Sequence, residues 1–108
     1  MIKLISVVLP VYNGAAHMAA SIDSIINQTY TNWELIIVND CSIDETLAVA
    51  TKYAKTDSRI KVVSNEVNLK LPMTLNRGFD EANGDYYTWT SDDNMYKPNA
   101  FQKLVDEV

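Results

Sequence analysis

Apolar residues along the chain follow two kinds of pattern that alternate with each other. Nearly continuous apolar runs, rich in β-branched or aromatic residues, occupy positions 4–9, 33–38, 60–63 and 86–90. Such runs are typical of strands that are buried on both faces, as in a parallel sheet. Between these runs, and after the last one, apolar residues recur every three or four positions, which predicts amphipathic helices.

Local signals indicate where the predicted helices begin and end. The first helix is expected over residues 15–26, where the apolar stripe follows a Tyr-Asn-Gly turn. The second is expected to begin at Ser42, which with Glu45 three residues later has the spacing of a capping box. The third is expected to end near Asn83 and Gly84, a pair typical of helix C-termini.

The predicted order of elements is therefore βαβαβαβα, in a single domain over residues 1–108. This alternation indicates an α/β fold in which helices cover both faces of a parallel sheet through right-handed crossovers. A chain of 108 residues suffices for one hydrophobic core. We place Trp33 and Trp89 in that core, because both lie within predicted strands. Since the pattern stops on an amphipathic helix, we interpret the chain as the truncated front part of a longer protein.

Polar and aromatic residues follow each predicted strand at the point where it ends. In an open parallel sheet, ligands bind outside the carboxyl ends of the strands, so these residues are expected to meet at one edge. They are Pro10, Val11, Tyr12 and Asn13 after the first strand, Asp40 after the second, Lys70 in the loop after the third, and Asp92 and Asp93 after the fourth. An aromatic ring, three carboxylates and a cation at one edge predict a binding site.

The residue types narrow the chemistry of that site. Asp92 and Asp93 are adjacent carboxylates without a nearby His or Cys, which suits Mg²⁺ or Mn²⁺ bound by oxygen ligands. Such a metal would bridge a diphosphate and neutralise charge on a leaving nucleoside diphosphate. Asp40 could accept the imide N–H of uracil or thymine, Tyr12 could stack on the base, and Lys70 could reach a phosphate or the base edge.

The same segments resemble the family 2 glycosyltransferases, which have the GT-A (Rossmann-like) fold. The segments S-V-V-L-P-V-Y-N at 6–13 and W-E-L-I-I-V-N-D-C-S at 33–42 are similar to the family's first two signatures, the second of which usually ends D-D-G-S. Residues 68–86 are similar to its third signature. The segment S-D-D-N at 91–94 occupies the place of the metal-binding D-x-D-D. The resemblance covers essentially the whole chain.

The resemblance implies that residues 1–108 are the nucleotide-diphospho-sugar-binding half of a glycosyltransferase catalytic domain. It implies an inverting transfer from a donor that we expect to be UDP-linked to a polysaccharide, lipid or protein acceptor. It assigns metal coordination to Asp93, with a ribose or secondary metal contact to Asp92. The remaining assignments place Pro10, Val11, Tyr12 and Asp40 in the nucleotide pocket and Lys70 at a basic donor-site position.

Three positions depart from the family pattern. Ser91 replaces the first Asp of the metal motif, Asn39 replaces the first Asp of D-D-G-S, and Cys41 replaces its Gly, so that turn must tolerate a side chain. The family's catalytic base is usually a later carboxylate, and we identify no candidate for it in this sequence. We therefore expect the chain alone to bind nucleotide with little transferase activity.

The site residues also have structural interpretations. Asp40 could be a turn residue before a capped helix, Tyr12 could pack in the core, and Lys70 could be solvated. Two other functions stay open at this point. One is a non-catalytic module that binds nucleotide or self-associates, for instance as a homodimer. The other is an acidic, Mg²⁺-dependent phosphotransfer domain.

Composition excludes several further classes. A formal net charge of −5 disfavours nucleic acid as a partner, because phosphate-backbone binding needs a basic patch. The chain has three Gly and no G-x-G-x-x-G motif, which excludes a dinucleotide-binding oxidoreductase. No apolar run is long enough for a membrane span. The lone Cys41 and the lack of a signal-peptide pattern favour the cytoplasm, with the inner face of the membrane as an alternative location.

Overall fold

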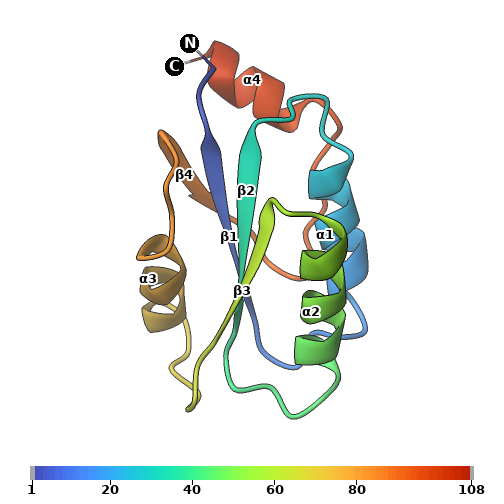
Figure 1. Cartoon of the computed structure of the whole chain (residues 1–108), viewed down its shortest axis with the longest axis vertical. Helices are drawn as coiled ribbons and strands as arrows, with labels where there is room; N and C mark the ends of the chain where they lie inside the picture. Colours follow the sequence, from blue (N-terminus) through green and yellow to red (C-terminus); the bar gives the residue numbers. More distant parts are fainter. Residues whose placement is uncertain (1, 108) are drawn as a thin grey trace.

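A four-stranded parallel sheet runs through the centre of residues 2–107, which are the residues that the computed structural model describes (Figure 1). The elements are β1 (Ile5–Val11), α1 (Met18–Ile26), β2 (Trp33–Asn39), α2 (Thr46–Thr56), β3 (Ile60–Ser64), α3 (Met73–Phe79), β4 (Tyr86–Trp89) and α4 (Ala100–Asp106). The predicted βαβαβαβα order and the α/β fold class are confirmed. None of the described helices is long and apolar enough to cross a bilayer.

The strand order β3-β2-β1-β4 places β1 and β2 in the middle of the sheet. Their parallel register runs from Ile5 opposite Trp33 to Val11 opposite Asn39. A central strand buries side chains on both faces, which explains why Val7 and Val8 are both fully buried although they point to opposite sides. Because all four strands run in parallel, their carboxyl ends share one edge of the molecule.

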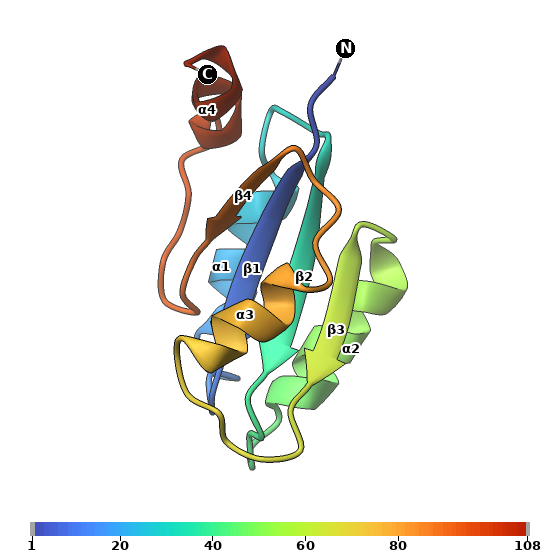
Figure 2. The same ribbon diagram turned by 90° about the vertical axis from the view of Figure 1, so that its left-hand side faces the viewer.

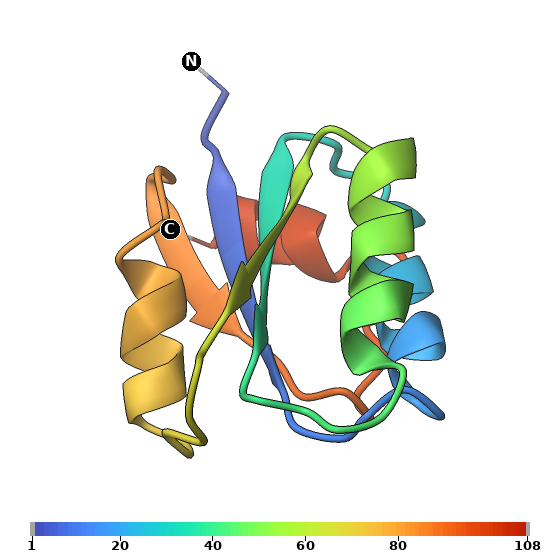
Figure 3. The same cartoon turned by 60° about the horizontal axis from the view of Figure 1, so that its bottom comes forward.

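Helices cover both faces of the sheet, as Figures 2 and 3 show, with α3 on one face and α1 and α2 on the other. On the larger side, Met18, Ile22 and Ile25 of α1 and Phe101 of α4 form one cluster with alternate residues of the strands. On the α3 side, a smaller cluster joins Val8, Ile36 and Val38 of the strands to Leu75 and Phe79. The period-two alternation along each strand thus supplies both cores.

Two predicted helix ends differ from the structure. Residues 15–17 form a turn, in which the N–H groups of His17 and Met18 both donate to the Gly14 carbonyl at 3.0 Å, so α1 begins at Met18. The third helix ends at Phe79 and not near Asn83 and Gly84. Position 84 needs a Gly for close packing and not as a helix end, since a Cβ there would lie 2.4 Å from the Ser6 Oγ of β1.

A buried carboxylate ties the sheet to the connection between α3 and β4. Glu34, in β2, is 7% exposed and accepts hydrogen bonds from the Ser6 hydroxyl at 2.5 Å and the Asn83 N–H at 2.6 Å. The Lys61 ammonium lies 3.4 Å from its other oxygen. Burial alone would raise the pKa of Glu34, but the donors around it outweigh burial and lower the pKa from its ordinary 4.5. The ionised form therefore stabilises the fold.

We predict that Glu34→Gln lowers the free energy of unfolding by about 2 kcal/mol at neutral pH, because hydrogen bonds to a charged acceptor are lost. A lowered folded pKa means that this contribution is complete above pH 4.5 and disappears as the pH falls from there through the folded value. Urea unfolding at a series of pH values measures both effects. The exposed Glu81→Gln is the matched control. Identical acid profiles for Glu34→Gln and the wild type would contradict the prediction.

Candidate functional site

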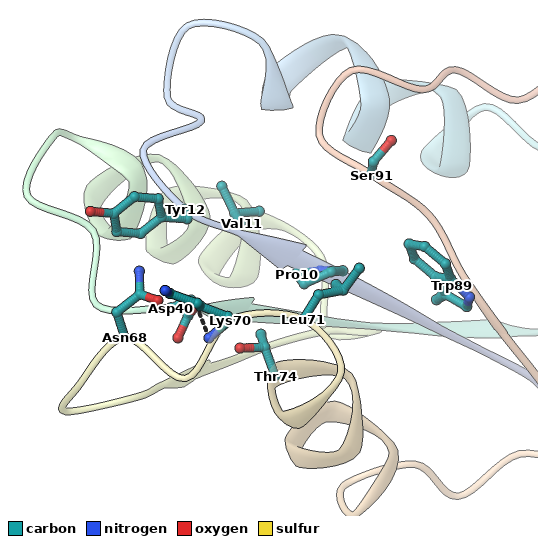
Figure 4. Close-up of a pocket in the computed structure, with 10 residues that line it drawn as sticks. All are labelled: Pro10, Val11, Tyr12, Asp40, Asn68, Lys70, Leu71, Thr74, Trp89 and Ser91. Carbon is teal, nitrogen blue, oxygen red and sulfur yellow. Dashed lines mark hydrogen bonds between the residues drawn. The ribbon is translucent and has the colours of Figure 1, made fainter.

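A cleft of about 490 Å³ opens at the carboxyl edge of the sheet, between the ends of β1, β2 and β4 and the segment that enters α3 (Figure 4). Of the seven residues that the family resemblance assigns to the donor site, five line it. The lining residues are Pro10, Val11, Tyr12, Asp40, Asn68, Lys70, Leu71, Thr74, Trp89 and Ser91. The structure therefore brings together the predicted residues from the first three strand ends.

Tyr12 follows β1 directly, and its side chain is 54% exposed at the cleft. The backbone next to it is held by a reciprocal pair of hydrogen bonds with the loop after β2. The Asn13 N–H donates to the Ser42 hydroxyl, and the Ile43 N–H donates to the Asn13 side-chain oxygen, both at 2.9 Å. The loop that carries Tyr12 is thus bonded to the loop after β2, and the Tyr12 ring is exposed at the cleft and not packed in the core.

A second set of contacts joins the same two loops. The Gly14 N–H donates to the Thr46 hydroxyl at 3.0 Å, and the Ala15 N–H donates to Asp44 at 3.2 Å. Asp44 also accepts the Thr46 N–H at 2.9 Å, at the start of α2. The predicted capping box of Ser42 and Glu45 is therefore wrong. The Ser42 hydroxyl bonds to the loop after β1, and Glu45 makes no side-chain cap bond.

Asp40 lies just beyond β2, is 4% exposed, and holds the loop after β3 in place. One carboxylate oxygen accepts the Leu69 N–H at 2.7 Å and the Asn65 side-chain amide at 2.9 Å, and the other accepts the Lys70 N–H at 2.8 Å. Burial alone would raise the pKa of Asp40, but these donors and the Thr74 hydroxyl outweigh it and lower the pKa from 3.8. At least three of about four acceptor positions of the carboxylate are therefore occupied by the protein itself.

Three residues around the cleft have left-handed backbone conformations, namely Asn13 (φ 52°), Cys41 (φ 61°) and Lys70 (φ 62°). This region suits Gly or Asn and costs most other residues about 1 kcal/mol or more. The expectation that the turn at Cys41 must tolerate a side chain is met, with the thiol 3.4 Å from the Glu66 carbonyl oxygen. Nothing in the sequence predicted the left-handed backbone conformation of Lys70.

Asp92 and Asp93 do not line this cleft but a neighbouring depression beside α1, together with His17 and Ser21. The Ser91 hydroxyl donates to Asp93 at 2.8 Å. Asp92 lies against the loop after β1, since a Cβ on Gly14 would lie 2.1 Å from its carboxylate oxygen. The structure thus places the two predicted metal ligands next to the β1 loop and not directly beside Asp40.

The residues present fit a hard divalent cation in part. Asp92 and Asp93 supply carboxylate oxygens, the donor type that Mg²⁺ and Mn²⁺ prefer. Across residues 2–107, however, no group of three or more His, Cys, Asp or Glu residues is arranged to hold a metal. A metal at this position would have to complete its coordination with water and with the oxygens of a ligand.

Sequence reasoning missed several residues of the site. Trp89 was expected in the core but is 46% exposed and lines the cleft, whereas Trp33 is buried as expected. The reason is that β4 is an edge strand, and its alternation turns Trp89 away from the larger cluster. Asn65, the partner of Asp40, stands in a polar loop where no periodicity or motif indicated its contact.

Comparison with known proteins gives the relationship of the chain. The family model for glycosyl transferase family 2 matches residues 6–108. An uncharacterised glycosyltransferase of Haemophilus influenzae is 41% identical over 102 residues, which are 94% of this chain and 32% of that protein. TuaG of Bacillus subtilis, a putative teichuronic acid biosynthesis glycosyltransferase, is 33% identical over 95% of this chain and 41% of its own length.

A solved structure is similar as well. The crystal structure of S. aureus TarS 1–349 in complex with UDP-GlcNAc superposes with a TM-score of 0.88 at 25% identity, over 94% of this chain and 30% of that one. This chain therefore spans 30% to 41% of the length of the three proteins. The strand and helix order also matches that of a GT-A fold. The chain belongs to glycosyltransferase family 2.

Proposed function

We propose that the cleft binds a nucleoside-diphosphate sugar, with UDP as the nucleotide, and that residues 1–108 are the donor-binding half of a glycosyltransferase. The observation that carries the proposal is the meeting of an exposed aromatic ring, an ionised buried carboxylate and a cation in one cleft, at Tyr12, Asp40 and Lys70. The UDP-GlcNAc complex of the similar TarS structure supports it.

The base is assigned to the Tyr12 end of the cleft. The exposed Tyr12 ring offers a stacking face. Asp40 stays ionised because its pKa is lowered, and it keeps at most one acceptor position for a ligand. The imide N–H of uracil is a single donor and suits that position, whereas cytosine presents an acceptor at the same ring atom. Pro10 and Val11, at the end of β1, line the cleft next to these groups.

The diphosphate is assigned to Lys70 and to a divalent metal, Mn²⁺ or Mg²⁺, held by Asp93 with Asp92. When bound, the metal would neutralise charge on the departing nucleoside diphosphate. Since residues 2–107 offer two carboxylates there and no third, we expect the diphosphate to contribute ligands beside water. Metal and nucleotide should therefore bind with positive coupling, each raising the affinity of the other.

The acceptor and the stereochemistry are proposed on family grounds. We infer an inverting transfer to a polysaccharide, lipid-linked or protein acceptor, carried out in the cytoplasm or at the inner face of the membrane. The similarity to TuaG, named for teichuronic acid biosynthesis, supports a polysaccharide acceptor. None of the cleft carboxylates is assigned as the catalytic base, because Asp40 is already bonded to three protein donors. Self-association as a homodimer stays a prediction.

Calorimetric titration with UDP, with and without Mn²⁺, tests the donor site. We expect UDP to bind more tightly with Mn²⁺, and Asp93→Ala to remove this gain, on the order of tenfold or more, because a metal ligand is lost. Asp106→Ala, an exposed carboxylate on α4, is the control and should bind like the wild type. If folded wild-type chain binds no UDP under either condition, the proposed function is wrong. If UDP affinity is the same with and without Mn²⁺ and in Asp93→Ala, the metal has no part in the proposed donor site.

Discrimination between pyrimidines tests the role of Asp40. We expect wild-type chain to prefer UDP over CDP by about tenfold, because cytosine has no N–H to donate at this position. Asp40→Asn should reduce the preference and also loosen the loop of Lys70, since an amide cannot accept all three protein donors. Parallel titrations with UDP and CDP measure the preference. Equal binding of UDP and CDP by the wild type would refute the assignment.

Substitutions of Lys70 separate its charge from its backbone. We expect Lys70→Gly and Lys70→Ala to weaken UDP binding alike, by about fivefold, because both remove a cation near the diphosphate. Lys70→Gly should be more stable than Lys70→Ala by about 1 kcal/mol, since Gly adopts φ 62° without strain. Urea unfolding and UDP titration of the two variants provide the measurements. A stability difference without any loss of UDP affinity would leave Lys70 with a backbone role only.

A further inference from the structure

The cleft continues past the residues assigned to the nucleotide and ends at an exposed indole. Figure 4 shows Tyr12 and Asp40 toward one end and Trp89 with Ser91 at the other, with Pro10 and Leu71 between them. The two charged residues that line the cleft, Asp40 and Lys70, belong to the Tyr12 half. The Trp89 half is therefore lined by apolar and neutral groups.

Trp89 is held firmly in this position by the sheet. It pairs with Val8 of β1, and the next residue, Thr90, donates its N–H to the Val8 carbonyl at 3.0 Å. Its neighbour on the same face, Tyr87, is stacked on Phe79 of α3, with ring centroids 5.8 Å apart and planes 8° from parallel. Trp89 lies two residues further along the strand, at the cleft, and is 46% exposed.

An exposed aromatic ring beside an aliphatic wall suits a particular class of ligand. The negative face of the indole attracts the slightly positive C–H groups of a neutral ring. A pyranose has such a face of C–H groups, while its hydroxyls point outward to water or to polar neighbours. The half-exposed Leu71 supplies the aliphatic wall, and Ser91, whose hydroxyl donates to Asp93, lies at the same end. A phosphate would find no cation among these lining residues.

We propose that Trp89, with Leu71, forms the subsite for the hexose of the sugar donor. This inference rests on the proposed function, because the direction of the ligand follows from the base lying at Tyr12. In a nucleoside-diphosphate sugar the hexose is joined to the base end through ribose and diphosphate, so it must lie further along the cleft. Trp89 stands at that far end and is an aromatic platform in a neutral environment.

The two tryptophans of the chain make the subsite measurable by fluorescence. Trp33 is 1% exposed and Trp89 46%, so quenching by acrylamide reports mainly on Trp89. With Mn²⁺ present, we expect saturating UDP-N-acetylglucosamine to protect Trp89 from the quencher and UDP alone to leave it accessible. Protection by UDP alone would overturn the inference. So would protection by free N-acetylglucosamine without protection by the nucleotide sugar, since that would indicate an acceptor site.

Affinity measurements on variants provide an independent arm. Trp89→Leu should weaken UDP-N-acetylglucosamine binding by about fivefold and leave UDP binding unchanged, because only the stacking on the hexose is lost. Tyr87→Leu, an aromatic on the same strand that is stacked on Phe79, is the matched control and should leave the ratio of the two affinities unchanged. Tyr12→Leu should weaken both ligands equally.

Failure of the hexose subsite and failure of the proposed function give different results. If wild-type chain binds neither UDP nor the nucleotide sugar, the proposed function fails and the subsite fails with it. If both bind, but the nucleotide sugar neither protects Trp89 nor loses affinity in Trp89→Leu, the proposed function stands and the hexose subsite is wrong.

Discussion

The parallel pairing of β1 with β2 is the constraint on which the rest of the structure depends. Its ladder continues beyond the assigned strands, since the Asp40 N–H donates to the Val11 carbonyl at 2.8 Å. On the other side of β2, the Asn65 N–H donates to the Asn39 carbonyl at 2.9 Å in the same way. These bonds bring Asp40 beside β1 and beside the loop after β3. A slip of one residue would move the carboxylate to the opposite face of the sheet.

The electrostatics of the cleft explain how an acidic chain can offer a site to an anion. With a formal net charge of −5, the overall field repels phosphates. Asp40, however, is surrounded by N–H donors, so much of its charge is compensated by the protein. Lys70 then contributes a cation next to that compensated carboxylate. The local arrangement of charges in the cleft therefore outweighs the negative net charge of the chain.

The sequence was sufficient to predict the arrangement of strand ends. Parallel order follows from the alternation of strands and helices, and it places Tyr12, Asp40 and Lys70 at one edge whatever the details of the loops. The contacts of Ser42 were not predictable, because a hydroxyl at a helix start has the same local signature whether it caps the helix or bonds a distant loop. Only the fold brings Asn13 within reach of it.

The same limit applies to burial and to side-chain direction. Trp89 has the composition of a core residue, but an edge strand leaves it without a covering neighbour at the cleft. Gly84 has the local signature of a helix end, but its role is a close approach to Ser6, 78 residues away in the sequence. Asp92 and Asp93 follow β4 as expected, yet they line a depression beside α1 and not the cleft. Local patterns specify elements, and packing between distant elements specifies the rest.

The reciprocal bonds between the loops after β1 and β2 have a consequence for motion. The loop after β1 donates the Asn13 and Gly14 N–H groups, and the loop after β2 donates the Ile43 N–H to the Asn13 side chain in return. Neither loop can therefore leave its place without breaking the bonds of its partner. The two loops should fluctuate as one cooperative unit, and their amide protons should exchange with solvent at a common rate. A ligand that touches Tyr12 alone would then slow exchange in the loop after β2 as well.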